Sequence, residues 1–216
     1  MSINKTYAVF GLGRYGLAVA KELCSNGAEV IAVDHNESIV EDLVGVLPVC
    51  KCADVTDPAA LEQLGIANVD TVIIAMACGL EASVMAVMLC KDAGVKEIIV
   101  KCGSEMHSRI FESMGASRVI FPENESGKRL AKNLLSSGFI DVASLSDDIS
   151  IVEIVTPKKW LGKTLRELDI RKNYSLNVIA VIAGGKTKLV SDPDTILDED
   201  TKLVVIANKK DIEKIK

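Results

Sequence analysis

The sequence predicts an α/β fold in which a Rossmann-like, doubly wound parallel sheet precedes a smaller α+β domain. Three observations support this prediction: a G-x-G-x-x-G motif between a strand and a helix, a regular alternation of apolar strands with helices, and the end of that alternation near residue 138. At 216 residues the chain exceeds one typical domain and falls short of two large ones. We therefore assign residues 1–138 to the first domain and residues 139–216 to the second.

The glycine motif at residues 11–16 follows an apolar strand and opens a helix, as in a dinucleotide-binding βαβ unit. We expect Gly11 to form a tight turn, Gly13 to admit a phosphate close to the backbone, and Gly16 to let the helix pack on the strand. The free N–H groups of the helix N-terminus favour an anion. The alternative is a tight turn without a ligand. The residues assigned to nucleotide binding here are Gly11, Leu12, Gly13, Arg14, Tyr15 and Gly16.

Asp34 ends the next strand, roughly 20 residues beyond the motif, where a carboxylate accepts the hydroxyls of an adenosine ribose. Its charge repels a 2′-phosphate, which favours ATP, ADP or NAD(H) over NADP. Arg14 places a fork of donors within the loop, from which it can reach a terminal phosphate. For His35, which follows Asp34, both adenine contact and a surface position stay open.

The loops after later strands supply further candidates, because the carboxyl ends of parallel strands meet at one edge. Asp54 and Thr56 are expected to contact the base or the sugar, and for Asp54 both this contact and its absence stay open. Asp57 precedes a proline and is expected to cap a helix. Ala75 ends the fourth strand at the same edge and is included in the site.

Two charged residues lie at the carboxyl ends of the last strands of the first domain. Lys101 either reaches a phosphate or is simply solvated. Glu123 lies where a carboxylate can hold a divalent cation, Mg²⁺ or Ca²⁺, against nucleotide phosphates. Its alternative role is that of an acid at a helix N-terminus.

The elements of the first domain follow from apolar runs and the segments between them. The helix at 81–93 is apolar nearly all round, so it has to be covered by the sheet and a flanking helix or by another subunit. The predicted strands are 7–10, 29–33, 46–51, 70–75, 97–101 and 118–121, and the predicted helices are 17–23, 38–44, 58–64, 81–93, 105–114 and 128–135.

The second domain lacks long helices and contains neither histidine nor cysteine. Gly184 and Gly185 predict a hairpin turn. The remaining pattern predicts strands at 149–155, 176–182, 188–190 and 203–207, a helical turn at 165–168 and a closing helix at 209–215. Because no acid–base set is visible there, we interpret the chain as a binding module.

Composition narrows the partners and the compartment. The net charge of −5, with charges of both signs interspersed, argues against nucleic acid as a partner. The cysteines are expected as buried, small hydrophobes, without a disulfide or zinc site. Together with the lack of a signal sequence, this predicts a cytoplasmic protein. The apolar run at 72–90 contains Glu81, so we interpret it as a strand and a helix rather than a membrane span.

Five motifs, at residues 9–16, 32–34, 53–57, 115–123 and 160–165, extend the pattern along the whole chain. In this combination the sequence resembles the RCK (regulator of K⁺ conductance) family, with an RCK N-terminal (TrkA-N) and a C-terminal (TrkA-C) domain. Such chains are cytosolic regulatory subunits of bacterial Trk/Ktr potassium-uptake systems.

The resemblance implies a first domain that binds ATP, ADP or NAD(H), and a homodimer that assembles into a ring, commonly an octamer. The ring lies beneath a membrane-embedded potassium-translocating subunit, at the inner face of the membrane, and gates it when the nucleotide changes. It also implies that Arg14 reaches toward a terminal phosphate, often from a neighbouring subunit. Glu123 matches an acid linked to a divalent cation at the dimer contact, and helices 81–93 and 127–135 match oligomer surfaces.

In some members of this family the second domain binds cyclic di-AMP between two copies. Ile170, Arg171, Asn177 and Pro193 lie where such a site would form, with Arg171 placed to pair with a phosphate and Asn177 with a base edge. Their alternative interpretation is as turn and strand residues of a small domain.

Two other functional classes are considered. An NAD-dependent oxidoreductase needs an acid–base set that the second domain does not show. A redox-sensing transcriptional regulator needs a DNA-reading element, and neither a helix-turn-helix pattern nor a basic face is visible. The sequence therefore favours a nucleotide-gated regulatory subunit that is not an enzyme.

Overall fold

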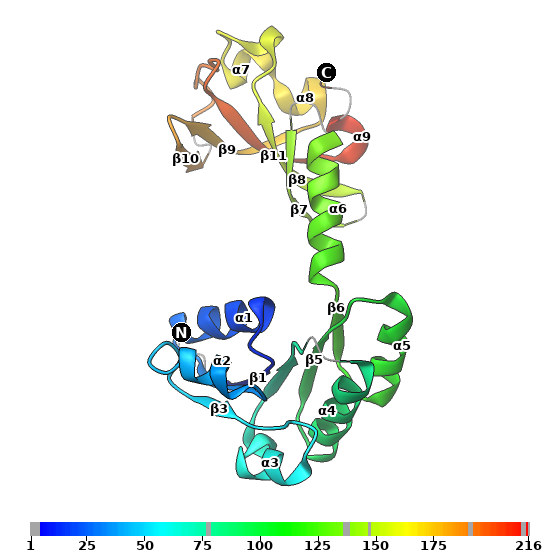
Figure 1. Cartoon of the computed structure of the whole chain (residues 1–216). Coiled ribbons are helices and arrows are strands. Elements are labelled where there is room, and N and C mark those ends of the chain that lie inside the picture. The colour runs from blue at the N-terminus through cyan, green and yellow to red at the C-terminus, as the bar shows by residue number, and fades with distance from the viewer. Residues whose placement is uncertain are drawn as a thin grey trace. The chain divides into compact units, whose positions relative to one another are not determined.

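The computed structural model of the chain describes residues 5–76, 79–135, 139–146, 148–189, 192–212 and 215. It divides into two compact units, Met1–Asn124 and Glu125–Lys216, with the division inside helix α6 (Pro122–Leu135). Figure 1 labels the elements of both units. The domain boundary after residue 138 stays a prediction.

The first unit is built on a six-stranded sheet in the order β3-β2-β1-β4-β5-β6. All neighbouring strands are parallel, which confirms the predicted doubly wound sheet. The reversal of strand order lies between β1 and β4. The strands are β1 (Thr6–Phe10), β2 (Glu29–Asp34), β3 (Cys50–Cys52), β4 (Thr71–Ile74), β5 (Glu97–Lys101) and β6 (Arg118–Ile120).

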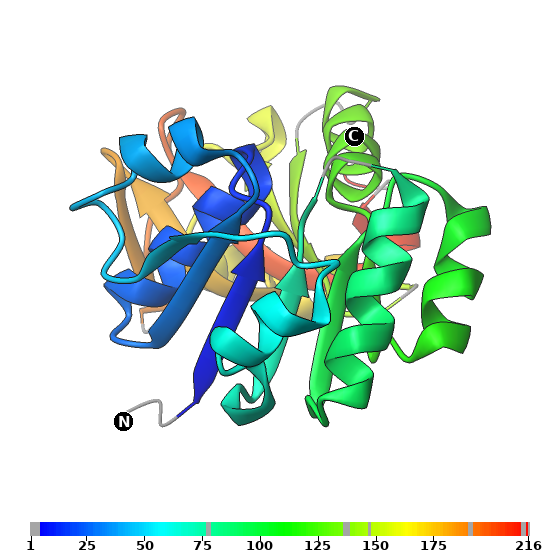
Figure 2. The same cartoon turned by 60° about the horizontal axis from the view of Figure 1, so that its bottom comes forward.

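Helices cover both faces of this sheet (Figure 2). α1 (Arg14–Ser25) and α2 (Glu37–Asp42) pack on one face, around a core that includes Val9, Ala32 and Ile73. On the other face the core includes Phe10 and Val72 and packs under the remaining helices. These are α3 (Pro58–Gln63), the short 3₁₀ helix Ile66–Asn68, α4 (Leu80–Asp92) and α5 (Glu105–Met114).

Within its own unit, α4 packs against both the sheet and the flanking helix α5. Ala86 and Cys90 are fully buried, whereas Met85 and Met88 are each 40% exposed. The sheet and α5 therefore cover much of this apolar helix and leave Met85 and Met88 partly exposed. No helix in the described part of the chain is long and apolar enough to cross a membrane.

The second unit contains a five-stranded antiparallel sheet in the order β10-β9-β11-β8-β7. Its core surrounds the fully buried Trp160. Gly184 and Gly185 have φ of +55° and +73° and form the predicted hairpin turn. The elements are β7 (Phe139–Ser144), β8 (Ile149–Val155), the 3₁₀ helix Lys158–Trp160, α7 (Leu165–Leu168), α8 (Ile170–Tyr174), β9 (Asn177–Ala183), β10 (Lys186–Leu189), β11 (Lys202–Asn208) and α9 (Lys209–Ile212).

Some elements differ from their predicted extent. β3 begins at Cys50 instead of residue 46, because the chain first turns at Gly45 (φ +81°) and then passes Pro48. α6 begins at Pro122, since proline suits a first helical turn and a single Gly127 does not interrupt it. The sequence pattern does not predict β7 or α8: β7 is an edge strand with a register shift, and α8 is only 5 residues long.

The expectation that the cysteines are buried holds in part. Cys90 and Cys102 are buried, but Cys52 is exposed at the end of the edge strand β3, so that prediction was wrong for Cys52. The described cysteines are free thiols. Cys78 lies outside the described residues.

Candidate functional site

The glycine loop joins β1 to α1 at the carboxyl edge of the sheet. Gly11 has φ +88°, and a Cβ there would lie 2.9 Å from the backbone of Met76, so the position requires glycine. A Cβ on Gly16 would lie 1.9 Å from the carbonyl oxygen of Gly11. A Cβ on Gly13, by contrast, would have no described atom within 4 Å apart from its chain neighbours and its own helix. Two glycines therefore shape the loop, and the third leaves open space beside it.

Asp34 ties the glycine loop to the end of β2. Its Oδ2 accepts a hydrogen bond from the backbone N–H of Leu12 at 2.7 Å, and its Oδ1 accepts one from the N–H of Asn36 at 2.9 Å. His35 Nδ1 lies 3.3 Å from the same Oδ1. Asp34 is only 6% exposed, but its Oδ2 accepts a single described hydrogen bond and so retains a lone pair for a ligand hydroxyl.

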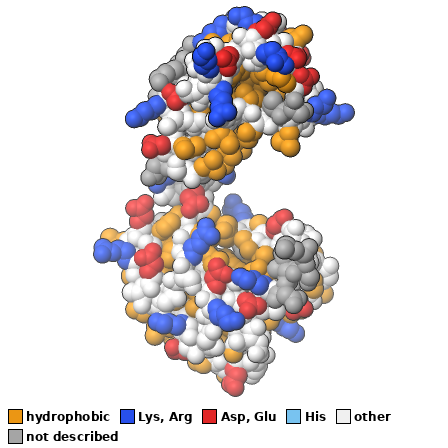
Figure 3. Space-filling view, turned by 180° about the vertical axis from the view of Figure 1, so that it is seen from behind, with side chains coloured by type: hydrophobic (Ala, Val, Ile, Leu, Met, Phe, Trp, Pro, Cys, Tyr) orange, Lys and Arg blue, Asp and Glu red, His pale blue; other side chains and the backbone are white. Residues whose placement is uncertain are grey.

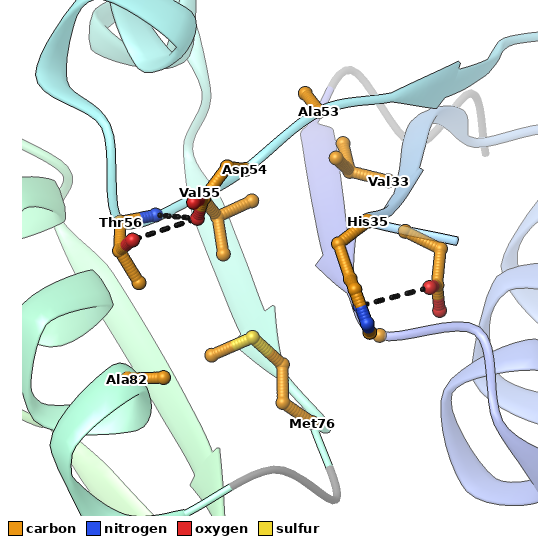
Figure 4. Close-up of a pocket in the computed structure, with 10 residues that line it drawn as sticks. Val33, His35, Ala53, Asp54, Val55, Thr56, Met76 and Ala82 are labelled. Atoms are coloured by element: carbon orange, nitrogen blue, oxygen red, sulfur yellow. Dashed lines mark hydrogen bonds and ion pairs between the residues drawn. The ribbon is translucent and has the colours of Figure 1, made fainter. Parts of the chain in front are cut away.

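A cavity of about 230 Å³ opens beside Asp34 at this edge. Figure 4 shows His35 on one side of it, Asp54 and Thr56 on the other, and Met76 between them. Its walls combine apolar side chains with a few polar ones, as small-molecule pockets generally do. The lining residues are Gly11, Val33, Asp34, His35, Ala53, Asp54, Val55, Thr56, Met76 and Ala82.

Asp54 and Thr56 form a local turn on the cavity wall. Asp54 Oδ1 accepts hydrogen bonds from the hydroxyl of Thr56 at 2.7 Å and from its backbone N–H at 2.9 Å. The hydrogen bond from the Thr56 hydroxyl, and to a lesser extent the one from its N–H, holds the pKa of the Asp54 carboxyl below its usual value. Asp54 is therefore ionised at neutral pH and presents acceptors to the cavity. Asp57 caps α3 through a hydrogen bond from the N–H of Ala59, as expected.

The N-terminus of α1 forms the other end of the site. Gly13 is the N-cap and supplies no side chain, and the first turn contains no acidic residue. The positive end of the helix dipole is therefore not offset by the helix's own side chains. Arg14 is exposed and makes no hydrogen bond or ion pair with the described residues, so its guanidinium is available to a ligand.

Lys101 and Glu123 contact each other directly. Lys101 Nζ lies 2.6 Å from Glu123 Oε1 and 5.9 Å from the centroid of the Tyr15 ring. The hydrogen bond from Lys101 holds the pKa of the Glu123 carboxyl below its usual value. Within the described ranges, no group of three or more His, Cys, Asp or Glu could hold a metal ion. The described partner of Glu123 is therefore the Lys101 ammonium.

The structure brings part of the predicted site together. Gly11, Asp34, His35, Asp54 and Thr56 line the cavity. Ala75 lies behind the loop: its N–H bonds to the carbonyl oxygen of Phe10, and it is 6% exposed. The phosphate-end candidates, which do not line this cavity, are Leu12, Gly13, Arg14, Tyr15, Gly16, Lys101 and Glu123.

Sequence reasoning missed the apolar walls of the cavity. Met76 and Ala82 come from the loop and helix after β4, and Val33, Ala53 and Val55 flank the polar candidates. In the sequence these residues are marked only by their position near strand ends. That position does not distinguish a residue that lines a cavity from one that is buried in the core.

A second cavity, of about 550 Å³, lies in the second unit. All of the residues proposed for a second ligand line it: Ile170, Arg171, Asn177 and Pro193. Arg166, which the sequence did not single out, also lines it and forms a two-pronged pair with Asp194 at 2.7 and 3.1 Å. Arg171 remains exposed beside it.

Comparison with family models divides the chain as the fold does. Residues 7–122 match the TrkA-N domain and residues 149–216 match the TrkA-C domain. The chain is 35% identical over 213 residues to the Ktr system potassium uptake protein C of Bacillus subtilis (strain 168), covering 98% of this chain and 96% of that protein. It is 32% identical over 203 residues to the Ktr system potassium uptake protein A of Vibrio alginolyticus, covering 94% and 92%.

Solved structures show the same fold. The RCK domain of GsuK has a TM-score of 0.67 at 19% identity, covering 97% of this chain and 46% of that chain. The GsuK channel bound to NAD has a TM-score of 0.51 at 21% identity, covering 99% and 38%. The chain thus spans less than half of the GsuK chains that it matches. With both domain models matched in order and relatives aligned along nearly its whole length, the protein belongs to the TrkA/Ktr family of potassium uptake proteins.

Proposed function

We propose that the chain is a nucleotide-binding regulatory subunit, not an enzyme, of a Ktr/Trk-type potassium uptake system. The observation that carries the proposal is the cavity beside the glycine loop, in a chain whose full-length relatives are named potassium uptake proteins. The GsuK channel is named as bound to NAD, which supports a nucleotide in this fold. The subunit works in the cytoplasm, at the inner face of the membrane, through a membrane-embedded potassium-translocating partner.

The ligand is ATP, ADP or NAD(H), bound in one orientation. Adenosine occupies the cavity, with its ribose hydroxyls on Asp34 and its base between His35 and Asp54. The phosphates then face the N-terminus of α1 and the open space at Gly13. Arg14 and Lys101 contact the terminal phosphate, so the site distinguishes ligands by their charge. A divalent cation at Glu123 would take further ligands from phosphate oxygens and would displace Lys101.

Subunits pair and assemble into a ring, which we propose to be an octamer. Exposed apolar side chains support an oligomer surface: Met85 and Met88 on α4, and Leu130 and Leu134 on α6, which are 60% and 77% exposed. Figure 3 shows hydrophobic side chains at the surface of both units, with basic and acidic groups interspersed. Size-exclusion chromatography with light scattering tests this, because a ring has a far greater mass than a monomer or dimer.

Substitution of Arg14 tests the nucleotide part of the proposal. Arg14→Ala should reduce ATP affinity by about tenfold and change ADP affinity by less than about twofold, because the guanidinium contacts only the terminal phosphate of ATP. Isothermal titration calorimetry of the full chain measures both. Equal losses for ATP and ADP would contradict the role of Arg14, and no heat with ATP, ADP or NADH would contradict nucleotide binding itself.

Gating is tested with the translocating partner present. Potassium flux into vesicles that contain both proteins should differ between ATP and ADP, and Arg14→Ala should remove that difference. A ligand shifts a two-state assembly only through different affinities for its two states. Equal flux with both nucleotides would contradict regulation by phosphate number.

We also propose cyclic di-AMP as a ligand of the second unit. The support is the cavity lined by Ile170, Arg171, Asn177 and Pro193, in which the Arg171 guanidinium can pair with a phosphate. Calorimetry should show binding that Arg171→Ala weakens by about tenfold or more. The absence of heat at high ligand concentration would contradict this proposal and leave the first site untouched.

A further inference from the structure

Lys101 connects two parts of the first unit that are distant in sequence. It ends β5, and its ammonium contacts Glu123 in the first turn of α6 at 2.6 Å. The same ammonium lies 5.9 Å from the centroid of Tyr15, in the first turn of α1. The Lys101 side chain is 22% exposed, whereas that of Glu123 is 67% exposed. The ammonium is thus held beside the phosphate end of the site, with a carboxylate as its anionic partner.

A bound nucleotide would bring a second anion to this ammonium. Tyr15 follows Arg14 at the N-terminus of α1, where free N–H groups and the helix dipole favour phosphate. The terminal phosphate carries more negative charge than a carboxylate, and it repels Glu123 as well as attracting Lys101. Both effects weaken the pair between Lys101 and Glu123.

We propose that Lys101 is an exchangeable cation, which holds Glu123 at the start of α6 and moves toward the terminal phosphate when a nucleotide binds. This inference rests on the proposed function, since it needs a nucleotide on the glycine loop. Its consequence is local: a triphosphate releases the first turn of α6. α6 continues past the division between the two units, so the release acts on the segment that joins them.

The exchange makes an unusual prediction about Glu123. If the carboxylate competes with phosphate for Lys101, its removal strengthens ATP binding. If instead it only positions Lys101 or serves a cation, its removal weakens ATP binding or leaves it unchanged. The experiment is therefore done with EDTA present, so that no divalent cation contributes.

Calorimetry with ATP on the full chain compares Glu123→Gln with Glu125→Gln. Both variants remove one negative charge from the same helix, but Glu125 makes no ion pair with the described residues. We expect Glu123→Gln to bind ATP about five- to tenfold more tightly, and Glu125→Gln to change the affinity by less than about twofold. Unchanged or weaker ATP binding in Glu123→Gln would overturn the exchange.

Substitution of Lys101 completes a double-mutant cycle with Glu123→Gln. Lys101→Met should weaken ATP binding, and adding Glu123→Gln to it should give no gain, because the competition no longer exists. A gain in the double variant as large as in Glu123→Gln alone would overturn the role of Lys101. ATP binding to the unsubstituted chain without any gain in Glu123→Gln contradicts the exchange alone, whereas no ATP binding at all contradicts the proposed function.

Hydrogen exchange provides a readout that does not depend on the variants. Amides in the second turn of α6 should exchange severalfold faster with ATP than with ADP, again in EDTA, because the first turn loses its anchor. Equal or slower exchange with ATP would overturn the proposed release.

Discussion

Asp34 shows how one buried carboxylate has both a structural and a binding role. Its oxygens accept hydrogen bonds from the N–H groups of Leu12 and Asn36, and so they fix the glycine loop and the start of α2. Asp34 also lines the cavity beside the loop, where we propose that it accepts the ribose hydroxyls. A substitution at this position therefore affects folding and binding by different amounts, which allows the two roles to be separated.

Asp34→Asn and Asp34→Ala form the matched pair. Asparagine keeps one acceptor oxygen for the buried N–H of Leu12, whereas alanine leaves that donor unpaired at a cost of about 1–3 kcal/mol. Both should weaken ADP and ATP binding by about tenfold or more, because the charged acceptor of the ribose is lost. Thermal denaturation and calorimetry measure the two effects. A variant that binds ADP normally would exclude Asp34 from the site.

At the scale of the elements, the shape of the glycine loop depends on how closely its backbone atoms approach one another. Gly16 lies so near Gly11 that a methyl group would overlap its carbonyl oxygen, while Gly13 faces open space. The first contact brings the N-terminus of α1 to the end of β1. The open space at Gly13 leaves room for a ligand at that N-terminus.

Gly13→Ala should mainly reduce ligand affinity, whereas Gly16→Ala should mainly reduce stability. Gly13 has φ −63°, which alanine adopts readily, so Gly13→Ala should change the free energy of unfolding by less than about 1 kcal/mol and reduce ADP affinity by about tenfold or more. Gly16→Ala should lower stability by about 3 kcal/mol or more, because the backbone has to move. Urea denaturation and ADP titration test both. Normal stability in Gly16→Ala, or normal ADP binding in Gly13→Ala, would contradict this account of the loop.

At the scale of the whole molecule, each unit has its own hydrophobic core. Val72 belongs to the core of the first unit and Leu203 to that of the second, and both are fully buried. Residues without shared contacts usually contribute independently to stability. The single tryptophan, Trp160, lies in the second core, so its fluorescence reports on that unit.

Leu203→Ala should destabilise the second unit by about 2–5 kcal/mol, through the cavity that the smaller side chain leaves. ADP affinity should change by less than about twofold, because the site lies in the other unit. Val72→Ala is the control: it should weaken the first unit and leave the Trp160 unfolding transition unchanged. A large loss of ADP affinity in Leu203→Ala would show that the two cores unfold together.

Much of the fold follows from local patterns. The alternation of apolar strands with helices predicts the parallel sheet, and the paired glycines at 184–185 predict the hairpin between β9 and β10. The shorter elements do not follow in the same way. α8 has neither a side-chain cap nor the length to show periodicity, and it begins after Asp169 in a left-handed conformation (φ +41°).

The sequence by itself determined the glycine loop and the position of Asp34, because each depends on residue type and on spacing along the chain, whereas the four candidates in the second unit came from the resemblance to the RCK family. Only the tertiary structure decided that Met76 and Ala82 form a cavity wall and that Lys101, at the end of β5, pairs with Glu123 in the first turn of α6. The physical reason is that such contacts depend on which strand ends the sheet brings together. In the opening motif, the glycines set the shape of the loop. The ammonium of Lys101 lies beside that loop and is already paired with Glu123.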